Sequence, residues 1–270
     1  MVVNIITIEL VKELRKRTGA GMMICKKALI EANGNLELAI DYLRKQGETK
    51  YAKKIDYPTS SKQGLIIIKK DGNCCVMIEI NCETDFVSQN AYFKTFADHI
   101  ITTAISDRIK DIDILRSKFK DEQLILMNAV HENINIHRLS TVIEDEKEIS
   151  HYLHGNRIGV IVITSQGTNK QFGKSLAMHI AASKPEYIKP ELIPIEVLEH
   201  ERQIQIDLAR KSKQSTKFLD KIIEGRIKKY FNELTLIGQK FIFDPNQTVG
   251  QVLKENSTEV ITFHRFEIGE

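Results

Sequence analysis

The chain has 270 residues, of which 42% are hydrophobic and 28% are charged. This balance excludes an intrinsically disordered chain and supplies enough apolar residues for more than one folded core. The net charge is only +3, from 39 basic and 36 acidic residues. Charge alone therefore gives no indication of a nucleic-acid-binding protein.

The cysteines and the apolar runs exclude further classes. Cys25, Cys74, Cys75 and Cys82 show no C-x-x-C spacing, so we expect packed thiols in a reducing cytoplasm, with no metal site and no redox pair. The first ten residues lack the features of a signal peptide. Runs such as IGVIVI are far shorter than the roughly 20 residues of a membrane span. The expectation is a cytoplasmic protein that needs no cofactor and contacts neither membrane nor nucleic acid.

Residues 7–47 contain three short segments with apolar residues at helical spacing. Thr7 and Asn35 are suited to cap the first and third segments, and the Asn-Gly pair at 33–34 ends the second. Three helices with such short loops predict a small bundle. The polar stretch 48–63 has no periodicity and predicts a linker.

After residue 63 the pattern changes to strands and helices. GLIIIKKDGNCCVMIEI predicts a β-hairpin that turns at Asp71-Gly72, and we expect Ser88 to cap a helix at 88–105. The remaining expected elements are a helix at 122–132, strands at 132–144 and 157–167, a helix at 171–183, two long helices within 194–231 with a break near 212–215, a short helix at 244–255 and a strand at 259–270. The two long helices predict an antiparallel hairpin that projects from the body.

Two pairs of segments resemble each other. Residues 92–100 and 172–180 share the pattern aromatic-x-Lys-Thr/Ser-apolar-Ala-x-His-Ile, and residues 134–139 align with 261–266. The simplest interpretation is an α+β core that is built twice from one unit. The helical hairpin would then be inserted in the second copy.

The sequence contains no complete set of catalytic residues. Residues 167–175 resemble a phosphate-binding loop, G-x-x-x-x-G-K-S/T, but Gly167 and Gly173 have five residues between them instead of four. His99 and His179, at equivalent positions of the repeat, are either packed histidines or candidates for metal binding or catalysis. We therefore expect a protein that is not an enzyme. A nucleotide-binding enzyme that uses residues 167–175 is the alternative.

The stretch NCETDFV, residues 81–87, follows an expected strand. It places Asp85 and Phe86 side by side where that strand ends. Two interpretations are open from the residue types: Phe86 is a core residue that begins the next helix, or it is an exposed probe for a partner.

Three stretches together resemble bacterial elongation factor Ts, the guanine-nucleotide exchange factor of elongation factor Tu. They are residues 10–47 with the motif RTGAGMM, the motif TDFV, and residues 154–191, which begin HGNRIGVIV. The resemblance implies a three-helix domain similar to ubiquitin-associated (UBA) domains. A duplicated α+β core of antiparallel sheets and helices follows it, with an inserted antiparallel coiled-coil hairpin. The implied domains are 1–54, 55–135 and 136–270, with the hairpin at about 190–231.

The resemblance also implies a partner, elongation factor Tu in its GDP-bound and nucleotide-free states. The stretch that disturbs the partner's Mg²⁺ would be Thr84, Asp85, Phe86 and Val87. Asp85 and Phe86 would insert between two helices of the partner's G domain, next to this Mg²⁺, which bridges the nucleotide phosphates to the protein. GDP would then leave without covalent chemistry. An adaptor that uses residues 7–47 alone is a further alternative.

Other positions are implied more indirectly. Met22 and Met23 would rest on another helix of the partner's G domain, or else fill the bundle's own core, and His154 would lie near the partner's third domain. The chain has His131 where many family members carry a glycine, which puts a secondary contact near the phosphates in doubt. It ends at Glu270, where many relatives continue into a further helical module.

Overall fold

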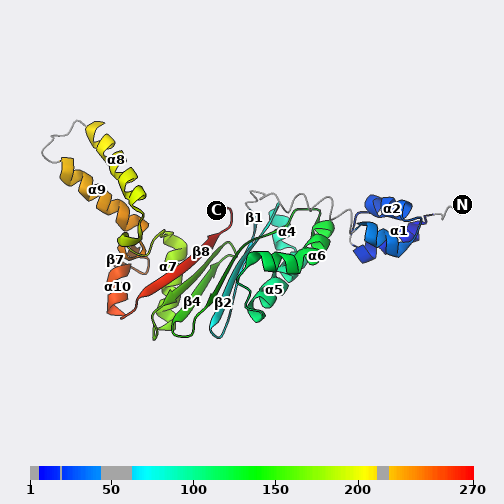
Figure 1. Ribbon diagram of the computed structural model, residues 1–270, viewed down its shortest axis with the longest axis horizontal. Helices are drawn as coiled ribbons and strands as arrows, with labels where there is room; N and C mark the ends of the chain where they lie inside the picture. The colour runs from blue at the N-terminus through cyan, green and yellow to red at the C-terminus, as the bar shows by residue number, and fades with distance from the viewer. Residues whose placement is uncertain (1–5, 19, 44–62, 212–218) are drawn as a thin grey trace. The chain divides into compact units, whose positions relative to one another are not determined.

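The computed structural model describes residues 6–18, 20–43, 63–211 and 219–270. Helices and strands mostly follow one another in runs of one kind along the described chain (Figure 1). The linker predicted at 48–63 lies outside the described residues except for Gln63, and so does the helix break predicted near 212–215. The chain divides into two compact units. Unit 1 is Met1–Ile143 with Gly155–Ile158 and Phe266–Glu270, and unit 2 is Glu144–His154 with Gly159–Arg265.

The N-terminal part of unit 1 is helical, as the apolar spacing predicts. It contains α1 (Ile8–Thr18), α2 (Met22–Glu31) and a further helical stretch at 36–43. Their apolar sides enclose one small core, formed by Val11, Leu14, Ala20, Cys25, Ala28, Leu29, Ala32, Ala39 and Leu43. Since so few residues are buried here, the ends of the helices matter for its stability.

Polar side chains fix these helix ends. The Thr7 hydroxyl oxygen accepts a hydrogen bond from the Leu10 amide at 3.3 Å, and Asn35 Oδ1 accepts one from the Leu38 amide at 3.1 Å. Both predicted N-caps are therefore confirmed. Asn33, with φ 50°, turns the chain after α2.

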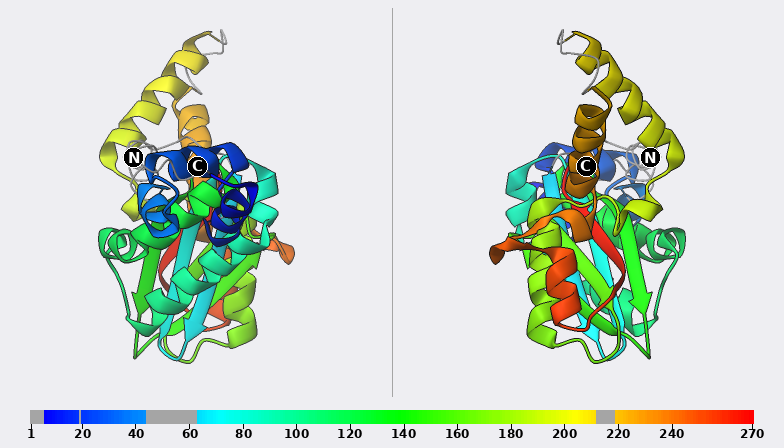
Figure 2. Two further views of the ribbon diagram at one scale, coloured as in Figure 1. Left: turned by 90° about the vertical axis from the view of Figure 1, so that its right-hand side faces the viewer. Right: turned by 90° about the vertical axis from the view of Figure 1, so that its left-hand side faces the viewer.

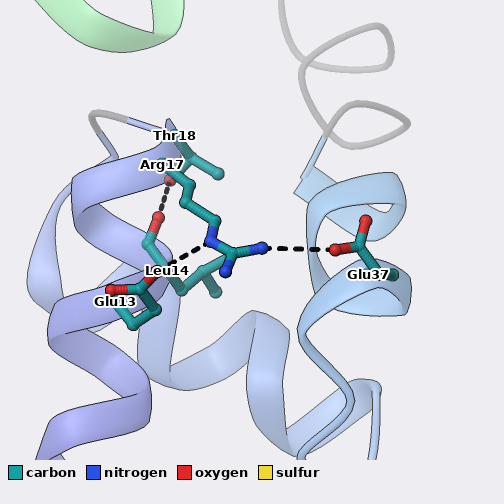
Figure 3. A network of polar contacts seen from close by, with 5 residues as sticks. All are labelled: Glu13, Leu14, Arg17, Thr18 and Glu37. Atoms are coloured by element: carbon teal, nitrogen blue, oxygen red, sulfur yellow. Dashed lines mark hydrogen bonds and ion pairs between the residues drawn. The ribbon is translucent and has the colours of Figure 1, made fainter.

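Arg17 links α1 to the helical stretch at 36–43 (Figure 3). Its guanidinium lies 2.8 Å from Glu13 Oε1 and 3.3 Å from Glu37 Oε1. The hydrogen bond to Arg17 lowers the pKa of Glu13 and raises that of Arg17. In the same turn the Thr18 hydroxyl donates to the Leu14 carbonyl at 2.7 Å. Because the three charged groups face water, they help to set the helix arrangement more than they add stability.

The first sheet is antiparallel and contains, in order, β1 (Gln63–Asp71), β2 (Cys74–Cys82) and β3 (Asn135–Ile143). β1 and β2 form the predicted hairpin: Asp71 pairs with Cys74, and Gly72, with φ 54°, lies in the turn between them. β2 is the middle strand, and every residue in it is buried. This burial explains its nearly continuous apolar run.

Three helices pack on one face of this sheet (Figure 1): α4 (Asp85–Gln89), α5 (Ala91–Ser106) and α6 (Ile112–Val130). Phe93, Ile100 and Leu115 are among their fully buried side chains, and they share one core with alternate residues of β2. The prediction that Ser88 caps a helix is wrong. Ser88 lies inside α4, and Asn90 caps α5 by accepting a 2.8 Å hydrogen bond from the Tyr92 amide.

Helix α6 begins well before the predicted helix at 122–132. Asp111 caps it by accepting a hydrogen bond from the Asp113 amide at 2.8 Å. The charged residues of its first half hid the apolar spacing, which Leu115 and Phe119 carry. Both side chains are buried, so the exposed charges lie on the solvent side of an amphipathic helix.

The second sheet contains, in order, β4 (Glu148–His154), β5 (Ile158–Thr164) and β8 (Val260–Glu267). The sequence did not predict β4, because only Ile149 in it is buried and its apolar alternation is weak. Helix α7 (Lys170–Ser183) packs along β4, as the yellow-green helix in Figure 2. A Cβ added at Gly173 would lie 2.2 Å from Ser150 Oγ, so the absence of a side chain allows this close approach.

The remaining elements belong to unit 2. They are η1 (Pro190–Leu192), α8 (Ile195–Lys211), α9 (Leu219–Leu234), η3 (Leu236–Gly238), β6 (Lys240–Phe241), β7 (Asp244–Thr248) and α10 (Val249–Glu255). Helices α8 and α9 pack against each other (Figures 1 and 2). The predicted short helix at 244–255 proves to be β7 followed by α10, which a capping box of Thr248 and Gln251 begins. None of the helices within the described ranges is long and apolar enough to cross a membrane.

The two three-stranded sheets share one topology. In each, a hairpin leads into a helix, and a later strand pairs with the second strand of the hairpin: β3 with β2, and β8 with β5. The segments that resemble each other in sequence fall on α5 and α7 and on β3 and β8. The subdomain boundary at 135/136 stays a prediction, and it coincides with the start of β3, which pairs with β2 of the first sheet.

We expect His131→Gly to stabilise the protein. His131 ends α6 in the left-handed conformation, with φ 62°, and its amide donates to the Met127 carbonyl at 2.9 Å. Glycine avoids the Cβ strain of about 1–2 kcal/mol but loses more freedom on folding. The free energy of unfolding, measured by urea denaturation, should therefore rise by about 0.5–1 kcal/mol. Asn256→Gly, at the end of α10 with φ −90°, should lower it instead. A loss of stability in His131→Gly would contradict this account.

We expect Gly173→Ala to destabilise the protein by about 1–3 kcal/mol, because the new methyl group collides with Ser150 of β4. Gly225→Ala in α9 is the matched control. Nothing lies within 4 Å of a Cβ added there, so the higher helix propensity of alanine should raise stability by about 0.5–1 kcal/mol. Both changes are measured by thermal and urea unfolding, and equal effects at the two sites would show that the close approach of α7 to β4 is unimportant.

Candidate functional site

Residues Thr84–Val87, which we call the tip, follow β2 after one intervening residue and lead into α4. Thr84 is the N-cap of α4, and its hydroxyl oxygen accepts a hydrogen bond from the Val87 amide at 3.4 Å. Asp85 and Phe86 are the first two residues of the helix. The tip is therefore the first turn of a helix, and the expectation that Asp85 and Phe86 lie at the end of the strand is wrong, since β2 ends at Cys82.

The tip exposes two side chains and buries one. Phe86 is 84% exposed, the largest exposed fraction among the large hydrophobic residues of the described chain, and Asp85 is exposed as well. Val87 is buried in the core of the first sheet. Of the two interpretations left open by the sequence, Phe86 does begin a helix, but it is not a core residue. Its ring is available to a partner, and Val87 anchors the turn that carries it.

Glu132, two residues beyond the end of α6, holds the base of the tip. Its Oε2 accepts hydrogen bonds from the amides of Glu83 at 3.1 Å and Thr84 at 2.9 Å, and its Oε1 accepts one from the Thr84 hydroxyl at 2.5 Å. In return, Glu83 Oε1 accepts a hydrogen bond from the Asn133 amide at 3.3 Å. No spacing pattern in the sequence points to Glu132.

A buried thiol adds a further contact below the tip. Cys82 Sγ donates to the Thr84 carbonyl at 3.1 Å. Burial, with a smaller contribution from the charge of Glu132, raises the pKa of Cys82 to about 12, so the thiol keeps its proton at neutral pH and remains a donor. All four cysteines are buried thiols, in agreement with the prediction of packed thiols.

The two methionines at the start of α2 face solvent. Met22 is 38% and Met23 is 75% exposed, and neither belongs to the core of the helical bundle. The alternative that they fill that core is therefore not supported. Gly21, which precedes them, has an ordinary extended conformation with φ −62°, and Gly19 lies outside the described residues.

The histidines singled out by the sequence lie in different surroundings. His154 is the exposed last residue of β4, with Nδ1 3.1 Å from the Tyr152 hydroxyl. His99 is exposed and lies 2.9 Å from a carboxylate oxygen of Glu122. His179, its equivalent in the repeat, is fully buried.

His179 is a packed histidine with defined partners. Its Nε2 lies 3.0 Å from Gln239 Oε1, and its Nδ1 accepts a hydrogen bond from the Ile242 amide at 3.4 Å. Burial lowers its pKa, so the ring is neutral and donates from Nε2. Among the residues that the structure describes, no group of three or more His, Cys, Asp or Glu side chains is placed to hold a metal ion.

The geometry of residues 167–175 argues against a phosphate-binding loop. A phosphate would be held by free amides at the start of α7, but Asn169 Oδ1 accepts from the amides of Gln171 at 2.8 Å and Phe172 at 3.3 Å. Ser175 donates its hydroxyl proton to the Gln171 carbonyl at 3.1 Å within the helix. The close approach of α7 to β4 accounts for Gly173 without a nucleotide.

Comparison with known proteins identifies the family. Residues 83–270, from just before the tip to the end of the chain, match the family model described as "Elongation factor TS". Curated proteins named "Elongation factor Ts" from Yersinia pestis (strain Pestoides F) and Yersinia pseudotuberculosis serotype O:1b (strain IP 31758) are each 49% identical over 267 residues, covering 98% of this chain and 92% of theirs. The chain belongs to the elongation factor Ts family, whose members act in translation elongation.

Proposed function

We propose that this protein binds elongation factor Tu in its GDP-bound and nucleotide-free states and promotes the release of GDP. Membership of the elongation factor Ts family supports the proposal. Such a function needs no catalytic residue, because an exchange factor acts by binding the nucleotide-free partner more tightly than the GDP-bound one.

The exposure of Phe86 is the observation that carries this proposal. A phenyl ring that is 84% exposed gains about 1.5–3 kcal/mol when a partner buries it. The turn beneath it is already held by Glu132 and by buried Val87. Less conformational entropy is therefore lost on insertion than a loose loop would lose.

In the proposed mechanism the tip acts on the Mg²⁺ site of the partner. Phe86 inserts between two helices of the partner's G domain, and Asp85, an exposed carboxylate, accepts hydrogen bonds from groups that had ordered the metal site. Mg²⁺ offsets the charge of the nucleotide phosphates, so disturbing its ligands weakens the binding of GDP. The burial of Phe86 favours GDP release only if the pocket that receives the ring opens as GDP leaves. A pocket present in both states would stabilise both equally and shift nothing.

Further contacts complete the proposal. Met22 and Met23 supply adaptable apolar surface that rests on another helix of the partner's G domain, and His154 lies near the partner's third domain. We assign residues 1–54 as a UBA-like domain, 55–135 and 136–270 as the two subdomains of the core, and about 190–231 as a coiled-coil hairpin. The place of action is the cytoplasm.

We expect Phe86→Ala to lower the rate of GDP release while leaving the fold intact. The loss should be roughly 2 kcal/mol, or about thirtyfold, because the inserted Phe86 side chain, which we call the wedge, carries the binding energy. Asp85→Ala should cost less, since the apolar ring remains. The assay follows release of labelled GDP from elongation factor Tu, with thermal melting of the same samples.

Phe243→Ala is the matched control, because Phe243 is a second exposed phenylalanine, 56% accessible, in unit 2. It should leave GDP release unchanged. Phe86→Ala should shift the free energy of unfolding by no more than about 0.5 kcal/mol, because its ring is 84% exposed. Phe243→Ala should lower it by about 0.5–1.5 kcal/mol, because the Phe243 ring packs 5.5 Å from the Phe241 ring. Normal GDP release by folded Phe86→Ala would refute the wedge.

We expect the double variant Met22→Ser with Met23→Ser to bind elongation factor Tu about tenfold more weakly, a loss of about 1.4 kcal/mol, without a change in GDP release at saturating concentration. The reason is that these side chains anchor the complex and do not touch the nucleotide site. Titration calorimetry measures the affinity, and Ile114→Ser on α6, 58% exposed, is the control for lost apolar surface. Unchanged affinity would remove the methionines from the interface.

A further inference from the structure

We propose that Glu132 is the positioning residue of the tip, holding Phe86 in the orientation in which it enters the partner. The inference rests on the proposed function, since it assigns a role to Glu132 in the same site. Its basis is a set of hydrogen bonds between residues 48 positions apart in the sequence, Thr84 and Glu132.

The chemistry of the contact requires a carboxylate. Glu132 Oε2 accepts two consecutive amides, those of Glu83 at 3.1 Å and Thr84 at 2.9 Å, while Oε1 accepts the Thr84 hydroxyl at 2.5 Å. Both oxygens must be acceptors, and an ionised carboxylate is acceptor-only. A glutamine would keep the shape but would point an NH₂ group at a donor on one side.

The bond to Oε1 also sets the N-cap of α4. A hydroxyl group has one proton, and the Thr84 hydroxyl donates it in the hydrogen bond to Glu132. This fixes the orientation of the hydroxyl, whose oxygen then accepts from the Val87 amide at 3.4 Å. Helix α4 has only five residues, which is too short to be stable by itself. Its conformation therefore depends on contacts from outside the helix.

Glu132 can act as a reference point because its own backbone is fixed. His131 ends α6 beside it, and Asn133, on its other side, is only 2% exposed and donates its amide to Glu83 Oε1 at 3.3 Å. β3 begins shortly afterwards at Asn135 and pairs with β2. Hydrogen bonds thus join Glu83 and Thr84, which follow β2, to Glu132 and Asn133, which precede β3. They tie the tip to the sheet, and Phe86 projects from the tip.

The consequence is that loss of the carboxylate loosens the tip without opening the core. Phe86 has little packing of its own, so its direction is set by the turn on which it stands. A misplaced wedge reduces the productive fraction of encounters, and small misplacements of reacting or binding groups reduce rates strongly.

The test compares Glu132→Gln and Glu132→Ala with the matched control Glu122→Gln, an acid on α6 whose partner is His99. Amide hydrogen exchange of the free full-length protein, read by NMR at Glu83 and Thr84, should accelerate at least tenfold in both Glu132 variants but not in the control. The melting temperature should stay close to that of the parent protein. Unchanged protection at these two amides would overturn the positioning role.

A second measurement tests whether Glu132 acts through Phe86. We expect Glu132→Gln to lower kcat/KM for GDP release about tenfold. If Glu132 acts through the ring, then combining it with Phe86→Ala should cost little more than Phe86→Ala alone. Additive losses, or a loss fully explained by a lower melting temperature, would overturn the inference. Normal GDP release in Phe86→Ala would instead refute the wedge, and the amide measurement would still decide whether Glu132 orders the tip.

Discussion

The polar backbone groups at the end of β2 need partners, because the chain leaves a strand whose residues are all buried. The carboxylate of Glu132 satisfies the amides of Glu83 and Thr84, and the Cys82 thiol satisfies the Thr84 carbonyl. These contacts allow the chain to turn at once into α4. The shape of the tip, and with it the direction of Phe86, depends on this local satisfaction of hydrogen bonds.

An exposed phenylalanine on a held turn is an unusual use of an apolar residue. In the free protein its ring gains almost nothing from the core, whereas Val87, the next residue, is buried in it. Under the proposed function, a partner gains binding energy when it buries this ring, and little further entropy is lost because the turn is already ordered in the free protein. Such a division suits a protein that must change another protein's affinity for its nucleotide without chemistry of its own.

The duplication places two different junctions at one topological position. In the first copy the chain passes from β2 to α5 through the tip, and in the second it passes from β5 to α7 through residues 165–169. There the hydroxyl of buried Thr168 donates to the Ser165 carbonyl at 2.7 Å, and Asn169 caps the helix. Residues 167–169, the start of the segment that resembles a phosphate-binding loop, therefore occupy the position of the tip in the second copy. This junction is held by these hydrogen bonds and by those between Ser165 and Glu259.

The sequence by itself determined the features that depend on neighbours along the chain. The Asp71-Gly72 turn, the caps at Thr7 and Asn35, and the motifs of the elongation factor Ts family are all local patterns. The predicted N-cap of α5 was wrong because Ser88 and Asn90 are both suitable N-cap residues. Packing against the sheet decides that the helix begins after Asn90. Whether Phe86 points into the core or into water, and that Glu132 reaches Thr84, were decided by tertiary structure alone. The reason is that these contacts join residues 48 positions apart, which no local periodicity encodes.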